Sequence, residues 1–109
     1  MVLELRAGDQ TPFQRAQAAR FGARLEIARG EADGVERGFK SAVGLYREIG
    51  TPFWLAMTLL EHSEWLVDQG RAEDAKPLLN EARDIFVRLR ATPWLERVEK
   101  TASAVGAPA

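Results

Sequence analysis

One short segment has the composition of a phosphate-binding loop. Residues 34–41 read Gly-Val-Glu-Arg-Gly-Phe-Lys-Ser. A phosphate-binding loop places its last glycine directly before the lysine and connects a strand to a helix. Here Phe39 separates Gly38 from Lys40, and helical spacing of the apolar residues runs through the segment. We therefore expect no nucleotide to bind there.

A second segment, His62-Ser63-Glu64, has the His-x-Glu spacing of zinc-dependent deaminases. One histidine and no cysteine cannot complete a metal shell, so His62 is expected to be packed and hydrogen-bonded to a neighbour. Glu61, Glu64 and Asp68 follow one helix surface instead of converging in a pocket, as general acid-base chemistry requires. The sequence predicts no catalytic residue, no metal and no cofactor, and the chain is not expected to be an enzyme.

Composition narrows the classes of partner. The chain has 109 residues, 46% apolar and 28% charged, which suits one folded domain. Its formal net charge of -1 provides no basic field for nucleic acid or anionic lipid. Apolar runs are only a few residues long, and no signal-peptide pattern is present. We expect a cytoplasmic protein that binds neither nucleic acid nor membrane.

The chain repeats itself with a period of about 40 residues, which indicates a fold built from stacked repeat units. Thr-Pro-Phe at 11–13 recurs at 51–53, and Thr-Pro-Trp follows at 92–94 after one extra residue. Gly30 recurs as Gly70. The other matches at this spacing are Ala32 with Ala72, Ala42 with Ala82, Leu45 with Ile85, Tyr46 with Phe86, and Ile49 with Leu89.

The repeated residues are helix start and stop signals. Threonine before proline is an N-cap followed by the helical position that tolerates proline, and Thr11 with Gln14 has the spacing of a capping box. Gly30 and Gly70 suit the left-handed conformation that ends a helix. Helices are therefore predicted to begin at the three prolines and turn back after the glycines. The predicted helices span 12–28, 32–49, 52–68, 72–89 and 93–105.

Apolar spacing assigns a buried face to each helix. In the second helix of each copy the apolar residues follow spacings of 4, 3, 4 and 3, which mark one helical face. They are Val35, Phe39, Ala42, Tyr46 and Ile49, and then Ala75, Leu79, Ala82, Phe86 and Leu89. The first helix of the first copy has two stripes, one of alanines with Ile27 and one containing Phe21 and Leu25. A helix that is apolar on two sides is expected to lie between neighbours, as in stacked repeats.

This pattern resembles a tetratricopeptide repeat. The residues that carry the resemblance are Leu59, Ser63, Leu66, Gly70, Ala75, Leu79 and Ala82, and in the weaker first copy Ala19, Ala23, Gly30, Phe39 and Ala42. The resemblance departs from the family at Glu26, Val35 and in the longer period. It implies an all-α solenoid of antiparallel helix hairpins, about two and a half repeats in five helices. Lengthened repeats of this kind resemble the C-terminal region of large bacterial signalling ATPases and of cyclase or LuxR-type regulators.

The expected organisation follows. Residues 1–10 are read as the remnant of a preceding helix or an N-terminal extension, and 106–109 as a flexible tail. Between them, 11–105 form the repeat domain. Its parts are repeats 11–50 and 51–91 and a capping helix 92–105.

The resemblance implies a module that binds a protein or peptide on the concave face formed by the first helices. The family's contact positions correspond to Gln17, Arg20, Arg24, Met57, Leu60, Glu64 and Asp68, with Arg97 and Lys100 less securely placed. Arg20 and Arg24, one turn apart, could hold an anion between them, which favours an acidic peptide; otherwise Arg24 would pair with Glu64. The alternative function is self-association as a homodimer with no separate ligand.

Two further features have alternative interpretations. Trp54 and Trp94 could be exposed anchors for a partner, but their repeated position favours packing between repeats. The small residues Gly30, Gly34, Gly38 and Ala42 occur at every fourth position and could allow a second chain to approach closely. That pattern is informative in membranes and weak in water.

Overall fold

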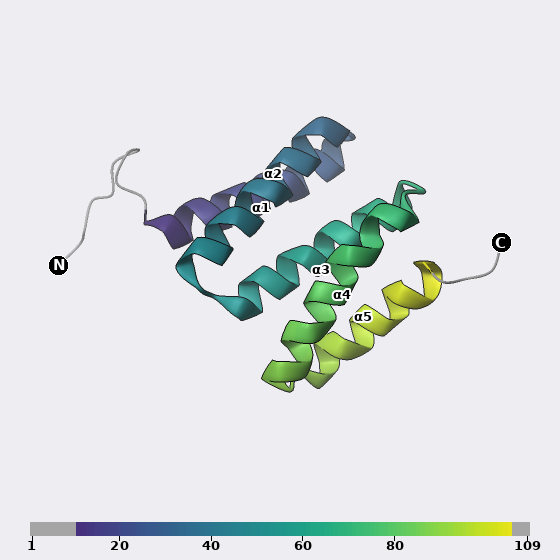
Figure 1. Cartoon of the computed structure of the whole chain (residues 1–109). Helices are drawn as coiled ribbons and strands as arrows, with labels where there is room; N and C mark the ends of the chain where they lie inside the picture. The colour runs from purple at the N-terminus through teal and green to yellow at the C-terminus, as the bar shows by residue number, and fades with distance from the viewer. Residues whose placement is uncertain (1–10, 106–109) are drawn as a thin grey trace. The chain divides into compact units, whose positions relative to one another are not determined.

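The computed structural model describes residues 11–105, and within that range it contains five α-helices and no strand (Figure 1). The helices are α1 (Pro12–Arg29), α2 (Ala32–Ile49), α3 (Pro52–Asp68), α4 (Ala72–Leu89) and α5 (Thr92–Val105). The predicted all-helical class is confirmed, and every helix end lies within one residue of its predicted position. The expectations for residues 1–10 and 106–109 lie outside the described residues. No helix of the described range is both long and apolar enough to cross a membrane.

The predicted helix starts at Pro12 and Pro52 are confirmed, but a threonine side chain caps only the first of them. At Thr11 the capping box forms: the Gln14 amide donates to Thr11 Oγ1 at 3.1 Å, and the Thr11 amide donates to Gln14 Oε1 at 2.9 Å. The predicted cap at Thr51 is wrong, because its side chain makes no capping hydrogen bond and its backbone, at φ -110° and ψ 84°, departs from the extended conformation of Thr11. The predicted start at Pro93 is wrong by one residue, since α5 begins at Thr92. Proline in a first turn is tolerated in both positions.

The two copies differ in the residue that follows the second helix of each hairpin. Gly30, Gly50 and Gly70 all have positive φ angles, of 74°, 80° and 76°. After α4 the corresponding left-handed position is occupied by Arg90 at φ 55°. A side chain in that conformation costs about 1–2 kcal/mol. The second copy therefore ends its hairpin less favourably than the first.

In the first unit α1 and α2 form an antiparallel hairpin whose helices approach closely (Figure 1). A Cβ atom added to Gly38 would lie 2.8 Å from the Ala23 Cβ and 2.9 Å from the Ala19 carbonyl oxygen. At Gly34 an added Cβ would meet the Glu26 side chain. These two glycines therefore face α1 of their own chain, and not a second chain as one hypothesis held.

The predicted face of α2 is confirmed over most of its length. Val35, Phe39, Ala42 and Tyr46 are buried, and only Ile49 is half-buried. The Tyr46 ring also packs against Phe13, with ring centroids 5.9 Å apart.

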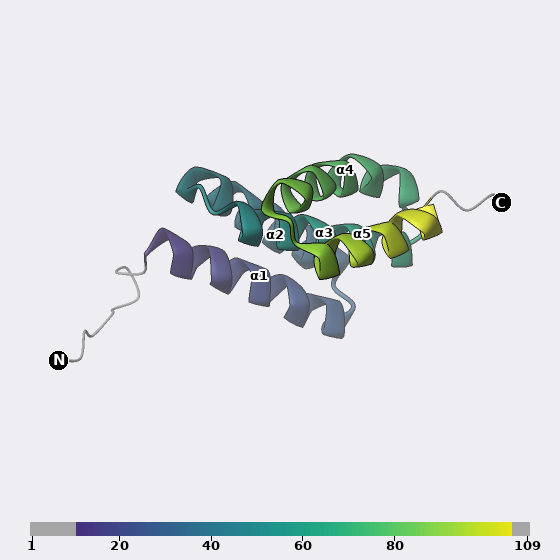
Figure 2. The ribbon, with the colours of Figure 1, turned by 90° about the horizontal axis from the view of Figure 1, so that it is seen from below.

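In the second unit α4 packs against α3, and α5 lies against α4 and α3 (Figure 2). Phe53, Phe86 and Trp94, one residue from each helix, form an aromatic cluster with ring centroids 5.5–6.2 Å apart. The predicted face of α4 is confirmed at Ala75, Leu79, Ala82 and Phe86, which are buried, but wrong at Leu89, which is exposed.

The chain divides into two compact units, with the boundary between Gly50 and Thr51. This is the junction expected between the two repeats. The expectation of one folded domain stays a prediction.

Candidate partner-binding surfaces

Three of the seven predicted contact residues lie on α1, and the structure gives them different environments. Gln17 accepts a hydrogen bond from the Tyr46 hydroxyl and so supports the hairpin internally. Arg20 is only 8% exposed, and its guanidinium lies 5.7 Å from the centre of the Phe21 ring. Arg24 is exposed. An anion held between Arg20 and Arg24 would have to reach a largely buried guanidinium.

The other four predicted residues lie on α3 and separate into two pairs. Met57 and Leu60 are buried, 7% and 0% exposed, and so contribute no exposed contact surface. Glu64 and Asp68 instead line an open cleft of about 340 Å³ between α3 and α5. Arg97 and Lys100 line the same cleft. The structure thus brings together the second pair and the two less securely placed residues.

The strongest polar contact in this cleft joins α3 to α5. Arg97 Nε donates to Glu64 Oε2 and Arg97 Nη2 donates to Glu64 Oε1, both at 2.6 Å. These hydrogen bonds raise the pKa of Arg97, although burial opposes them. The Arg97 guanidinium also lies 5.5 Å from the centre of the Trp94 ring. Because both side chains are about a third exposed, the pair contributes no more than about 1 kcal/mol to stability.

The expected pairing of Glu64 with Arg24 stays a prediction, because the two residues belong to different units. The cleft is lined by two carboxylates and two cations, so their formal charges sum to zero. Val67, Thr101 and Ala104 complete the lining. The cleft could accept polar groups of a peptide, but its charge balance selects no particular sign of ligand.

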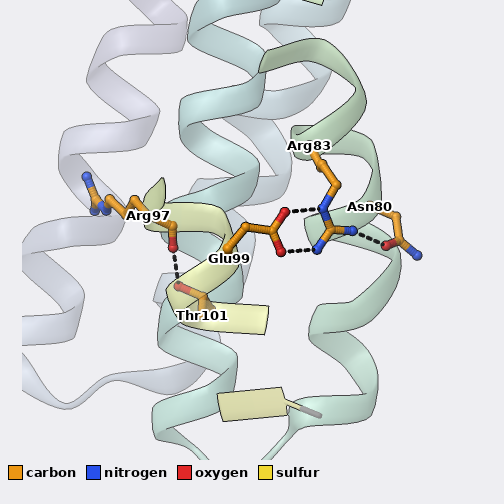
Figure 3. A network of polar contacts seen from close by, with 5 residues as sticks. All are labelled: Asn80, Arg83, Arg97, Glu99 and Thr101. Carbon is orange, nitrogen blue, oxygen red and sulfur yellow. Dashed lines mark hydrogen bonds and ion pairs between the residues drawn. The ribbon is translucent and has the colours of Figure 1, made fainter. Parts of the chain in front are cut away.

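A second polar network fixes α5 against α4 (Figure 3). Arg83 donates from Nε and Nη2 to the two carboxylate oxygens of Glu99, at 2.7 and 3.0 Å, and from Nη1 to Asn80 at 3.1 Å. Thr101 Oγ1 donates to the Arg97 carbonyl oxygen at 3.1 Å, which satisfies the hydroxyl inside α5. The bonds from Arg83 lower the pKa of Glu99. This network braces the helix that carries Arg97 and Lys100.

The phosphate-loop-like segment and the His-x-Glu segment both lie within helices. Residues 34–41 lie inside α2, as the spacing predicted. His62 is buried and lies beside Trp65, with ring centroids 6.2 Å apart. Trp94 packs in the aromatic cluster, which agrees with packing between the second repeat and the capping helix, while Trp54 packs edge-on against Phe53. Among the described residues, no group of three or more His, Cys, Asp or Glu could hold a metal ion.

The clearest exposed apolar surface lies on α1, where sequence analysis expected burial. Phe21 and Leu25 are 55% and 59% exposed, and Ala18 and Ala28 are exposed beside them. We call these four residues the α1 stripe. With 100° per residue, the stripe lies opposite the face that carries the buried Ala16 and Ala23. The sequence signal for it was the second apolar stripe itself, but the expectation that a neighbour covers it is wrong for the described residues.

The formal charges of α1 are strongly unbalanced. Its charged residues are Arg15, Arg20, Arg24, Arg29 and Glu26. Glu26 bonds to Arg29 at 3.1 Å and lies over Gly34 of α2, so this carboxylate is on the side of α1 that faces its own hairpin. With 100° per residue, arginines lie on both sides of the stripe. Arg24 is on one side, and Arg15 and Arg29 are on the other.

Comparison of the chain with models of protein families, with curated proteins and with solved structures gives no match.

Proposed function

We propose that this chain is a protein-interaction module built from tetratricopeptide-like helix hairpins, which holds a protein or peptide partner and catalyses no reaction. The observation that carries the proposal is the α1 stripe. Phe21 and Leu25 present apolar surface on a helix whose opposite face already packs against α2. Adjacent exposed apolar side chains on a packed helix are typical of a surface that another element covers.

The repeat supports the same interpretation. The positions 40 residues after Phe21 and Leu25 are Glu61 and Trp65 on α3, which are 8% and 6% exposed. This position of the repeat is therefore buried in one copy and exposed in the other. A stacked solenoid, in which each first helix has neighbours on both sides, would account for the apolar residues on α1.

The setting of the module is proposed on the resemblance alone. It is the C-terminal part of a larger cytoplasmic bacterial regulator, where such hairpins serve as a scaffold.

Site-specific crosslinking tests the proposal. A photoreactive phenylalanine analogue replaces Phe21 in the protein in its own host, and a matched variant carries the analogue at Lys40, which is exposed on α2. We expect a crosslink to one other polypeptide from position 21 and none from position 40. A crosslink to a second copy would favour the alternative, self-association. Equal labelling from both positions would refute the α1 stripe as a binding surface.

A further inference from the structure

We infer that the first hairpin, formed by α1 and α2, unfolds by itself while α3, α4 and α5 stay folded. The hairpin is thereby an order–disorder switch, and whatever binds only its folded form orders it. This inference goes beyond the proposed function and does not depend on it. The burial, helix propensity and internal contacts of the two units, each taken by itself, support it.

The first unit has a small apolar core. Even with the rest of the described chain present, α1 buries three side chains and α2 four, whereas α3 alone buries eleven. Two of the three on α1 are alanines, and the third is the charged Arg20. Three of the four large apolar side chains of α1, Phe21, Leu25 and Ile27, are exposed. Because apolar burial supplies most of the free energy that favours folding, a hairpin with so small a core is only marginally stable.

Helix propensity does not reverse this order. The first hairpin contains the internal glycines Gly22, Gly34, Gly38 and Gly44, and α4 contains Pro77. Relative to alanine, one internal glycine lowers the helix equilibrium about fourfold, and an internal proline lowers it by a factor on the order of 100. The four glycines together therefore cost about as much as the proline, and packing separates the stabilities of the two units.

The contacts of the second unit join three helices. In this unit α3, α4 and α5 each pack against the other two. Phe53, Phe86 and Trp94 contribute one ring from each helix to the aromatic cluster, and two ion pairs attach α5 to α3 and to α4. Removing one helix breaks contacts with both of the others, which favours cooperative unfolding of this unit.

In the first unit one residue, Tyr46, supplies two of the contacts between α1 and α2. Its ring packs against Phe13, and its hydroxyl donates a hydrogen bond to Gln17. When α1 separates from α2, these contacts are lost. Every contact described above for the second unit remains, because none of them involves a residue of the first hairpin.

The junction between the units allows the first to unfold without unwinding α3. The boundary lies between Gly50 and Thr51. The first turn of α3 is closed by the Leu55 amide, which donates to the Thr51 carbonyl oxygen at 3.0 Å, and both residues belong to the second unit. Pro52 fixes one backbone angle of that turn whatever the conformation of the preceding chain. The second unit thus retains its first helix when the hairpin unfolds.

Thiol labelling under native conditions tests the inference, because the chain has no cysteine of its own. Ala42→Cys on α2 and Ala82→Cys on α4 place one thiol at equivalent positions of the two hairpins, and both alanines are 0% exposed. At a low reagent concentration, refolding outpaces labelling, so the rate measures the fraction of molecules in which the thiol is uncovered. We expect Ala42→Cys to be labelled at least about tenfold faster than Ala82→Cys.

Two further changes calibrate these rates. Lys40→Cys, at an exposed position of α2, gives the rate of an unprotected thiol. Gly44→Ala stabilises α2, because nothing lies within 4 Å of the added atom. Combined with Ala42→Cys it should slow labelling about fourfold, and combined with Ala82→Cys it should leave the rate unchanged.

Hydrogen exchange of the unmodified chain supplies the same comparison if either cysteine disturbs its surroundings. After correction for intrinsic rates, the amides of α2 should exchange at least about tenfold faster than those of α4.

Two results would overturn the inference. If Ala82→Cys is labelled as fast as Ala42→Cys or faster, and α4 exchanges as fast as α2, the first hairpin does not unfold by itself. If Gly44→Ala slows both thiols equally, the two hairpins belong to one cooperative unit. Crosslinking from position 21 tests the proposed function separately, so either can fail while the other stands.

Discussion

The two hairpins begin with the same Thr-Pro-Phe sequence 40 residues apart, but their first helices lie in different environments. Three side chains of α1 are buried and eleven of α3 are. In its own unit α1 packs against α2, whereas α3 packs against both α4 and α5. The repeated residues therefore determine where a helix begins and which of its faces packs against the other helix of the hairpin. Whether the opposite face is buried depends on the neighbouring helices.

The hairpins also differ in how closely their helices pack. In the first hairpin Ala19, Ala23 and Gly38 meet at short range. The residues 40 positions later are Leu59, Ser63 and Leu78. The first hairpin thus relies on small residues and close backbone approach, and the second on large side chains. Both repeats therefore form a helix hairpin, but the side chains that pack between the two helices differ.

The largest effect should come from the equivalent residues Trp65 and Leu25. Trp65→Ala removes a side chain that is 6% exposed and should destabilise the protein by about 3–5 kcal/mol. Leu25→Ala removes one that is 59% exposed and should change stability by less than about 0.5 kcal/mol. Urea denaturation followed by circular dichroism measures both. A large loss for Leu25→Ala would show that the α1 stripe is covered in solution.

A smaller effect should come from two glycines of α2. Gly38→Ala brings a methyl group to 2.9 Å from the Ala19 carbonyl oxygen and should destabilise the first hairpin by about 1–3 kcal/mol. Gly44→Ala is the matched control: nothing lies within 4 Å of the added atom, so it should stabilise by about 0.8–1 kcal/mol through helix propensity. Thermal denaturation of the two variants should shift in opposite directions. Equal shifts of the same sign would contradict the close approach of α1 and α2.

The helices could be predicted from the sequence because local chemistry fixes them. Proline is tolerated at a helix start, glycine permits the left-handed end, and the spacings of 4 and 3 identify one face of α2 and of α4. The residue type alone did not predict the helix cap at Thr51, because capping also requires a particular backbone conformation. Thr51 has the residue type of a cap, but its backbone does not adopt the conformation that Thr11 does.

The candidate site was less predictable, because it depends on contacts between distant helices. Glu64 bonds to Arg97, 33 residues away, only because α5 packs beside α3. Met57 and Leu60 are apolar, and apolar residues serve both as surface anchors and as core residues, so their type alone does not separate the two roles. Their burial depends on how many helices surround α3. For the same reason the second stripe of α1 was visible in the sequence, but its exposure was not.

The smallest effect should come from the ion pair between Arg83 of the second hairpin and Glu99 of α5. The first hairpin has Val43 at the position equivalent to Arg83 and so has no such cation there. Arg83 lowers the pKa of Glu99 below its ordinary value of 4.5. The pair therefore contributes stability above about pH 4.5, and this is lost as the pH falls through the lower pKa of the folded state. Both side chains are partly exposed, so the contribution should be under about 1 kcal/mol.

Glu99→Gln should accordingly destabilise the second unit slightly at neutral pH, and the difference from the unmodified chain should shrink toward zero in acid. Tryptophan fluorescence in urea reports the second unit selectively, because Trp54, Trp65 and Trp94 all lie in it. Glu96→Gln, an exposed carboxylate on the same helix, is the control and should show no such convergence. A difference for Glu99→Gln that persists below the pKa of the folded state would mean that the side chain acts through packing against α4 and not through its charge.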